Sequence, residues 1–180
     1  IPLRTGSIRI KNKNFIKVKK KPLYFHALNQ TLKSKLIKKV FIATKSKKVK
    51  IKHKKLSIFK RSKKSNNKKS STEIVIGEFL KNNFCDYLVL IQATNLFIKA
   101  KHIDLAIKKL INNRKKYDSL LSVVKAKYFI WQQNKDLIIS KNYNYKKRPR
   151  SQDIKNKEFI ENGSFYIFKK KNFLKTKNRL

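Results

Sequence analysis

Two stretches of the chain carry apolar residues at the spacing of an amphipathic helix. The clearer stripe recurs at positions i, i+3, i+4, i+7 and i+8 and consists of Ile103, Ala106, Ile107, Leu110 and Ile111. The other stripe consists of Tyr24, Ala27, Leu28 and Leu32. It follows Pro22, which is tolerated at the start of a helix because its missing N–H needs no partner there. We therefore expect a helix in each stretch.

Other apolar residues form short continuous runs, which are typical of buried strands. The densest run is 87–92, and shorter runs occupy 40–43, 119–124 and 164–168. The unbroken apolar character of 87–92 indicates the buried centre of a parallel sheet. Because these strands alternate with helices, the pattern predicts an α/β fold with a mostly parallel central sheet.

A lysine-rich stretch separates the run at 40–43 from a further predicted helix. Residues 45–69 contain twelve Lys, one Arg and no acid, so we expect this stretch to be solvated. Its apolar residues suggest that it touches the core in places, namely Val49, Ile51, Leu56, Ile58 and Phe59. Ser70 and Glu73 then have the spacing of a capping box, in which each side chain bonds to the other's backbone N–H. The apolar residues that follow predict a helix beginning there, and 180 residues suit a single domain spanning 1–180.

The formal net charge of +40 leaves two interpretations open. A dense lysine coat binds polyanions without reading their sequence, which favours a nucleic-acid-binding protein. Only seven of the 49 basic residues are Arg, however, and joint enrichment in Lys, Asn and Ile is also typical of an AT-rich coding sequence. All nine acids lie at or after Glu73, so any catalytic carboxylate comes from the later part of the chain.

Several function classes are excluded or disfavoured by composition. The single cysteine, Cys85, rules out an internal disulfide framework, and a reducing cytoplasmic location is expected. The three His are far apart and have no second Cys to join, so no zinc-binding spacing exists. No apolar run approaches the ~18 residues of a membrane span, and the N-terminal stretch does not have the pattern of a signal peptide.

Four segments carry motif-like sequences in a fixed order. Residues 1–14 read Ile-Pro-Leu-Arg-Thr-Gly-Ser and end in Lys-Asn, and residues 59–72 run from Phe-Lys-Arg to Ser-Ser-Thr. Residues 89–96 read Val-Leu-Ile-Gln-Ala-Thr-Asn-Leu, and His-Ile-Asp follows at 102–104. Residues 161–167 read Glu-Asn-Gly-Ser-Phe-Tyr-Ile, after Arg-Ser-Gln-Asp at 150–153. Together these segments resemble the acylneuraminate cytidylyltransferase family (CMP-sialic acid synthetases).

The resemblance implies a three-layer, nucleotidyltransferase-like (Rossmann-like) α/β fold and a defined reaction. The anomeric hydroxyl of sialic acid, or of a related nonulosonic acid, attacks the α-phosphate of CTP and pyrophosphate leaves. Positioning and charge neutralisation govern such a step. The resemblance also implies Mg²⁺ as cofactor and a homodimer as the assembly.

By the same resemblance, site residues are assigned to three roles. Arg4 and Lys13 hold the triphosphate and act in catalysis. CTP is bound by Arg4, Gly6, Ser7, Lys13, Asn14, Arg61 and Ser71. The sugar is faced by Gln92, Gln152 and Asn162. No metal ligands are visible.

The chain departs from the family pattern at several of these places. Ile8 replaces a loop Lys, Lys45 stands where the family has Asp, and Ile160 stands where an Arg precedes Glu-Asn-Gly. We expect the family's first strand and its C-terminal Asp-x-Asp-Thr-Pro-Glu segment to be missing, and catalysis to be impaired as a result. The alternative function is polyanion binding on a degenerate cytidylyltransferase fold, with Tyr143, Tyr145, Lys146, Lys147 and Arg148 as its best aromatic-basic cluster.

Overall fold

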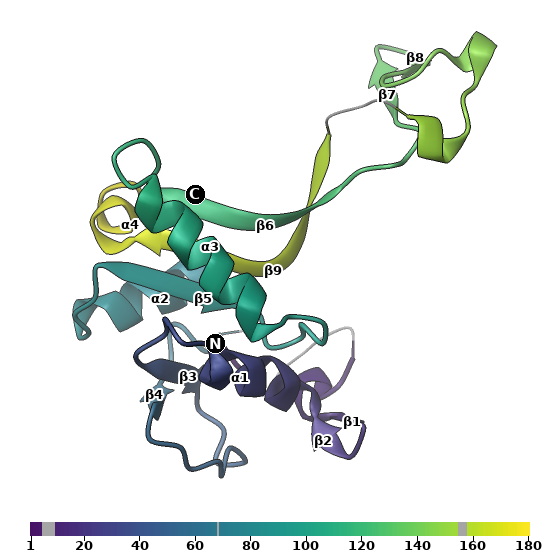
Figure 1. Ribbon diagram of the computed structural model, residues 1–180. Coiled ribbons are helices and arrows are strands. Elements are labelled where there is room, and N and C mark those ends of the chain that lie inside the picture. The colour runs from purple at the N-terminus through teal and green to yellow at the C-terminus, as the bar shows by residue number, and fades with distance from the viewer. Residues whose placement is uncertain (5–9, 68, 155–157) are drawn as a thin grey trace. The chain divides into compact units, whose positions relative to one another are not determined.

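The computed structural model describes residues 1–4, 10–67, 69–154 and 158–180 (Figure 1). The chain divides into two compact units. Unit 1 comprises Ile1–Leu121 and Gly163–Leu180, and unit 2 comprises Ser122–Asn162. The single domain expected over 1–180 stays a prediction. Within the described residues, no helix has the length and apolar character needed to cross a membrane.

The helices confirm the periodicities read from the sequence. The described α-helices are α1 (Leu23–Lys33), α2 (Thr72–Lys81), α3 (Ala100–Asn112) and α4 (Lys170–Thr176). Short 3-10 helices occupy η1 (Lys13–Phe15), η2 (Tyr145–Lys147) and η3 (Ser151–Asp153). Pro22 immediately precedes α1, as expected. On α3, three members of the predicted stripe are buried, namely Ile103, Ile107 and Leu110.

The predicted cap of α2 is wrong by one residue. The N-cap is Ser71, whose hydroxyl accepts a hydrogen bond from Ile74 N at 3.4 Å. Ser70 N already donates to Asn67 O, so it has no need of a carboxylate acceptor. Glu73 instead forms an ion pair with Arg179. The helix therefore begins with a simple serine cap and not with a capping box.

The strands form several small sheets. The described strands are β1 (Lys17–Val18), β2 (Lys21–Pro22), β3 (Val40–Thr44), β4 (Leu56–Lys60), β5 (Tyr87–Ile91), β6 (Ser119–Lys125), β7 (Trp131–Asn134), β8 (Leu137–Ser140) and β9 (Phe159–Lys169). The pairs β1–β2 and β7–β8 are antiparallel, whereas β3 and β4 are parallel. A three-stranded sheet has the order β5-β9-β6.

Two strand predictions need correction. The run at 87–92 forms β5, but its described neighbour β9 is antiparallel, with Tyr87 opposite Lys169 and Ile91 opposite Phe165. An apolar run reports burial and carries no information on the direction of the neighbouring strand. In addition, β4 lies inside the lysine-rich stretch, where no strand was predicted. Its residues are only partly buried or exposed, which explains why the sequence pattern missed it.

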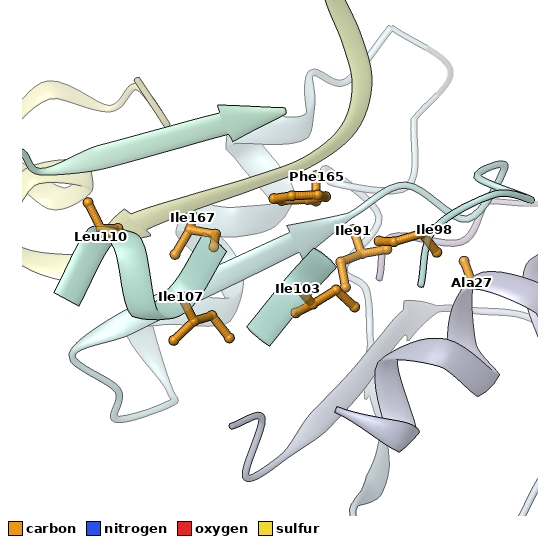
Figure 2. Close-up of a cluster of buried hydrophobic side chains, with 8 residues drawn as sticks. All are labelled: Ala27, Ile91, Ile98, Ile103, Ile107, Leu110, Phe165 and Ile167. Carbon is orange, nitrogen blue, oxygen red and sulfur yellow. The ribbon is translucent and has the colours of Figure 1, made fainter. Parts of the chain in front are cut away.

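Unit 1 has three layers, as the sequence predicts. One cluster of buried side chains joins α1 and α3 to one face of β5 and β9 (Figure 2). It contains Ala27, Ile91, Ile98, Ile103, Ile107, Leu110, Phe165 and Ile167. On the opposite face, the alternate strand residues Leu90, Tyr166 and Phe168 pack with α2 and α4. Because side chains alternate along a strand, the two clusters lie on opposite sides of the sheet.

Unit 2 contains the β7–β8 hairpin and an aromatic cluster. The Tyr143 ring contacts Phe129 edge-on at 4.6 Å between centroids and Trp131 at 6.0 Å. The guanidinium of Arg148 lies 3.9 Å above the Phe129 ring. Arg–aromatic and edge-to-face contacts of this kind hold the loop after β8 against the segment before β7.

Candidate functional site

The candidate site lies at one edge of three parallel stretches in unit 1, namely residues 1–3, β3 and β4. Residues 1–3 run alongside β3, with Leu3 N donating to Ala43 O (2.9 Å) and Ala43 N donating to Ile1 O (3.0 Å). This pairing is parallel, and β3 is parallel to β4. The carboxyl ends of the three stretches therefore meet at one edge, which is where open α/β sheets bind ligands. Arg4 and Arg61 directly follow two of these stretches.

Arg61 is a buried cation. Its side chain is 4% exposed, and its guanidinium donates to the carbonyl oxygen of Ser65. Among the described residues, no acceptor lies within hydrogen-bond distance of its buried Nε. Burial and then the positive charge of Arg4 lower the pKa of Arg61, while the Glu78 carboxylate opposes them. Arg4 is thus close enough for its charge to affect the pKa of Arg61.

Glu78 on α2 is the acid associated with this cation. Its Oε1 accepts a hydrogen bond from Ser62 N at 2.6 Å. Burial disfavours its ionised form, but hydrogen bonds from Ser65 and Ser62, together with the charge of Arg61, outweigh burial and lower its pKa. One carboxylate beside two arginines leaves the edge with excess positive charge. The sequence motifs did not point to Glu78, although it was among the nine acids available.

A side chain of η1 bonds to the end of the first parallel stretch. Asn14 is 8% exposed, and its Nδ2 donates to Arg4 O at 3.0 Å. Asn12, immediately before η1, has a left-handed φ of 53°, a conformation that Asn tolerates better than most residues. Lys13 lies in η1 and is half-buried. The structure thus joins Arg4 and Asn14, whereas the predicted ligands Gly6 and Ser7 lie outside the described residues.

The remaining predicted nucleotide residue, Ser71, serves α2 as its cap. Its hydroxyl oxygen faces Ile74 N, which satisfies one of the backbone donors exposed at a helix start. Such a cap is consistent with an anion-facing helix end, but it accounts for the serine by itself. The assignment of Ser71 to CTP therefore stays a prediction.

Gln92 directly follows β5 and begins a tight turn. Its N–H donates to Ser164 O at 3.2 Å, and its carbonyl accepts from Asn95 N at 3.2 Å. The Asn95 side chain donates to the Ser164 hydroxyl and accepts from two backbone N–H groups. Ala93 packs in the same buried cluster as Leu3 and Ile42, so the end of β5 lies near the first two parallel stretches. Asn95, which our motif reading did not select, holds this turn.

A recess of about 450 Å³ lies between α1 and the segment before α3. It is lined by His26, Asn29, Gln30, Leu96, Phe97, Ile98 and Lys99. Gln30 accepts a hydrogen bond from Ala100 N at 3.1 Å, which fixes the start of α3 beside α1. The lining mixes amide, aromatic and cationic groups, and the recess is open to solvent, so it does not define a ligand site by itself.

The other predicted sugar residues belong to unit 2. Gln152 is exposed in η3, where Arg150 and Asp153 form an ion pair at 2.7 Å. Asn162 Oδ1 accepts a hydrogen bond from the Ser122 hydroxyl at 2.7 Å. Both assignments stay predictions.

The described residues do not fit a magnesium site. Throughout the described ranges, no group of three or more His, Cys, Asp or Glu side chains is positioned to hold a metal ion. Magnesium needs near-octahedral oxygen coordination, commonly from one or two carboxylates with phosphates and waters. Glu78, an acid close to the candidate site, accepts a hydrogen bond from Ser62 N at Oε1, while its buried Oε2 has no partner among the described residues, so it offers a single oxygen and not a set of ligands. We therefore derive no catalytic step through a metal.

A comparison with protein families identifies the family of this chain. A family model described as cytidylyltransferase matches residues 1–179. The chain belongs to the cytidylyltransferase family. No curated protein matches the chain. The edge that carries Arg4 and Arg61 is therefore the candidate active site of a cytidylyltransferase fold.

Solved structures support the same fold at low identity. CMP:2-keto-3-deoxy-manno-octonic acid synthetase in complex with CTP is 15% identical, with a TM-score of 0.67, over 97% of this chain and 75% of that one. 4-Diphosphocytidyl-2C-methyl-D-erythritol synthase from Anaerococcus prevotii is 13% identical, with a TM-score of 0.63, over 91% and 69%. A cytidylyltransferase from Leptospira borgpetersenii is 15% identical, with a TM-score of 0.58, over 97% and 60%. At these identities the likeness shows the cytidylyltransferase fold alone.

Proposed function

We propose that this cytidylyltransferase transfers CMP from CTP to sialic acid or a related nonulosonic acid and releases pyrophosphate. The family match supports cytidylyl transfer, and one structural observation supports the site. Arg61, a buried arginine whose Nε has no partner among the described residues, lies within electrostatic range of Arg4 at the carboxyl edge of the parallel strands. The choice of acceptor rests on the acylneuraminate-like motifs in the sequence.

The two arginines act on the charge of the nucleotide. CTP carries most of its negative charge on the β- and γ-phosphates, and more develops on the leaving pyrophosphate as the bond to the α-phosphorus breaks. Arg61 is buried, so its field is less screened than that of a surface cation. It also costs no reorganisation during the reaction, because Ser65 and the Glu78 field already hold it. Arg4 and Lys13 complete the phosphate side in this proposal.

By the resemblance, the acceptor side is assigned to Gln92 of unit 1. Gln152 and Asn162, which lie in unit 2, stay sugar-binding predictions from the sequence. Gln92 is suited to orienting a polar sugar because the Asn95 turn fixes its backbone at the end of β5. Mg²⁺ stays an expectation from the family resemblance, since the described residues offer no set of ligands for it. A homodimer is also expected, and the β7–β8 hairpin supports it, since Leu137 is 70% and Ile138 68% exposed.

Pyrophosphate release tests the proposal directly. The full chain is incubated with CTP, Mg²⁺ and N-acetylneuraminate, with a no-sugar control and with an Arg61→Gln variant. We expect sugar-dependent release that is slow, as the departures from the family pattern imply. It falls at least tenfold further in the variant, since hydrogen bonds to charged groups contribute about 1.5–3 kcal/mol. Release that proceeds equally with the sugar omitted, or a complete lack of release from folded protein, would contradict it.

A second candidate function is supported by unit 2. Trp131 is 45% and Tyr145 57% exposed, with their ring centroids 5.9 Å apart, and Lys146 and Lys147 lie in the same loop. Exposed rings among lysines are the usual platform for single-stranded nucleic acid. This function predicts binding of a single-stranded RNA oligonucleotide that weakens steeply with salt and weakens further in Trp131→Ala. Equal binding by the variant would count against the platform.

A further inference from the structure

The register of the parallel strands brings a third cation into line with the two arginines. Pro2 is opposite Ala43, so continuing the pairing by two residues sets Arg4 opposite Lys45. Thr44 is opposite Lys60, so the next pair along is Lys45 and Arg61. The recorded pairs end at Ala43 and at Thr44–Lys60, and continuing their register places Arg4, Lys45 and Arg61 in one row across three neighbouring chain stretches. With strands about 4.8 Å apart, the row spans about 10 Å between its outer Cα atoms.

The same register assigns the row to one face. Phe41 of β3 and Phe59 of β4 both pack on Phe79 of α2. Because side chains alternate along a strand, the α2 face next receives positions 45 and 61. The other face is filled by Leu3 and Ile42, which assigns Arg4 to the α2 face as well. The electrostatic influence of Glu78, also on α2, on Arg61 agrees with this assignment.

We propose that Lys45 is a further phosphate-binding residue, which completes a row of three cations for the triphosphate of CTP. The inference rests on the proposed function and deepens it. Arg61 is buried and held in place, whereas Lys45 is exposed at the start of the segment after β3. Its long, mobile ammonium group is thus the member of the row that is able to follow a phosphate from solvent.

The row also provides positive charge that offsets the negative charge of the triphosphate. The described residues offer no cluster of three ligands for a cation, and Glu78 is the carboxylate whose charge acts on Arg61. Side chains at this edge therefore supply part of the neutralisation that the triphosphate needs. It follows that CTP binding by this chain persists in a chelator and depends on Lys45.

The test is the dissociation constant of CTP for the full chain, measured by isothermal titration calorimetry in EDTA at fixed ionic strength. Lys45→Gln is compared with Lys47→Gln, which removes an equally exposed lysine two residues away and changes the net charge by the same amount. We expect about tenfold weaker binding for Lys45→Gln, equivalent to about 1.4 kcal/mol. The control is expected to stay within twofold of the parent chain. Lys45→Arg is expected to restore most of the affinity.

The possible outcomes separate the inference from the function on which it rests. A parent chain that binds CTP while Lys45→Gln and Lys47→Gln bind it equally well would overturn the role of Lys45 alone. Failure of the folded parent chain to bind CTP, with or without Mg²⁺, would overturn both claims. CMP serves as a second ligand: Lys45→Gln is expected to weaken CTP more than CMP, because CMP carries fewer phosphate charges for the row to attract. Equal weakening of the two nucleotides would contradict the row.

Discussion

Asp104 is predicted to be a structural carboxylate whose loss destabilises the α1–α3 side of unit 1. One hydrogen bond comes from the Ser34 hydroxyl, at the end of α1. Lys35 N and Leu36 N donate two more, at 3.1 and 3.3 Å. The carboxylate therefore satisfies the turn after α1 from a position in α3, 70 residues later along the chain.

The magnitude follows from these three bonds. A hydrogen bond to a charged group contributes about 1.5–3 kcal/mol, but the two backbone donors are exposed and stand at the weak end of the range. We expect Asp104→Ala to lower the free energy of unfolding by about 3 kcal/mol. For a chain of this size that corresponds to a fall in Tm of roughly 6–12 °C. Asp104→Asn keeps one acceptor oxygen and is expected to lose about half as much.

The effect depends on pH in a defined direction. Burial disfavours the ionised form, but the bonds from Ser34, Lys35 and Leu36 outweigh it and lower the pKa of Asp104. A carboxyl whose folded pKa is depressed stabilises the protein fully above its unfolded pKa, about 3.9 for Asp. That stabilisation is lost as the pH falls through the folded value. The difference between the parent chain and Asp104→Asn is therefore large at pH 7 and shrinks below about pH 4.

Urea unfolding followed by circular dichroism at pH 7 and pH 3 measures this difference. The matched control is Asp136→Asn, which removes one carboxylate from an exposed hairpin turn and changes the net charge equally. We expect the control to remain within about 0.5 kcal/mol of the parent chain. A loss as large in Asp136→Asn as in Asp104→Asn, or one that is the same at both pH values, would refute the reasoning.

Three further predictions test other parts of the structure. Ser71→Ala is expected to cost about 1 kcal/mol of unfolding free energy in urea titrations, and more than Ser70→Ala, because the Ser71 hydroxyl caps α2. Arg61→Leu is expected to leave the loop at Ser65 without its donor and to lower both CTP affinity by calorimetry and Tm, whereas a variant as stable and as tight-binding as the parent would exclude the buried-cation role. The double change Leu137→Ser with Ile138→Ser is expected to convert the proposed homodimer to a monomer in light scattering, because it removes two exposed apolar side chains of the hairpin.

The sequence alone determined most of the helices and the type of fold. The apolar stripes at 24–32 and 103–111 marked α1 and α3 because a helix that buries one face repeats its apolar residues every three or four positions. The run at 87–92 marked β5, and the motif order led to the cytidylyltransferase family, which the family comparison confirms. These features are local, so the order of residues is sufficient to reveal them.

Only the tertiary structure decided how distant stretches meet. The antiparallel pairing of β5 with β9, the strand β4 within a lysine-rich stretch, and the bonds from the end of α1 to Asp104 all join residues far apart in sequence. The alignment of Arg4, Lys45 and Arg61 depends on strand register, which sequence periodicity does not encode across separate strands. By charge alone, these three residues do not differ from the rest of the 49 basic residues in the chain. The burial of Arg61, and its position with Arg4 at one sheet edge, distinguish these two arginines from the solvated lysine coat, and the proposed row adds Lys45 to them.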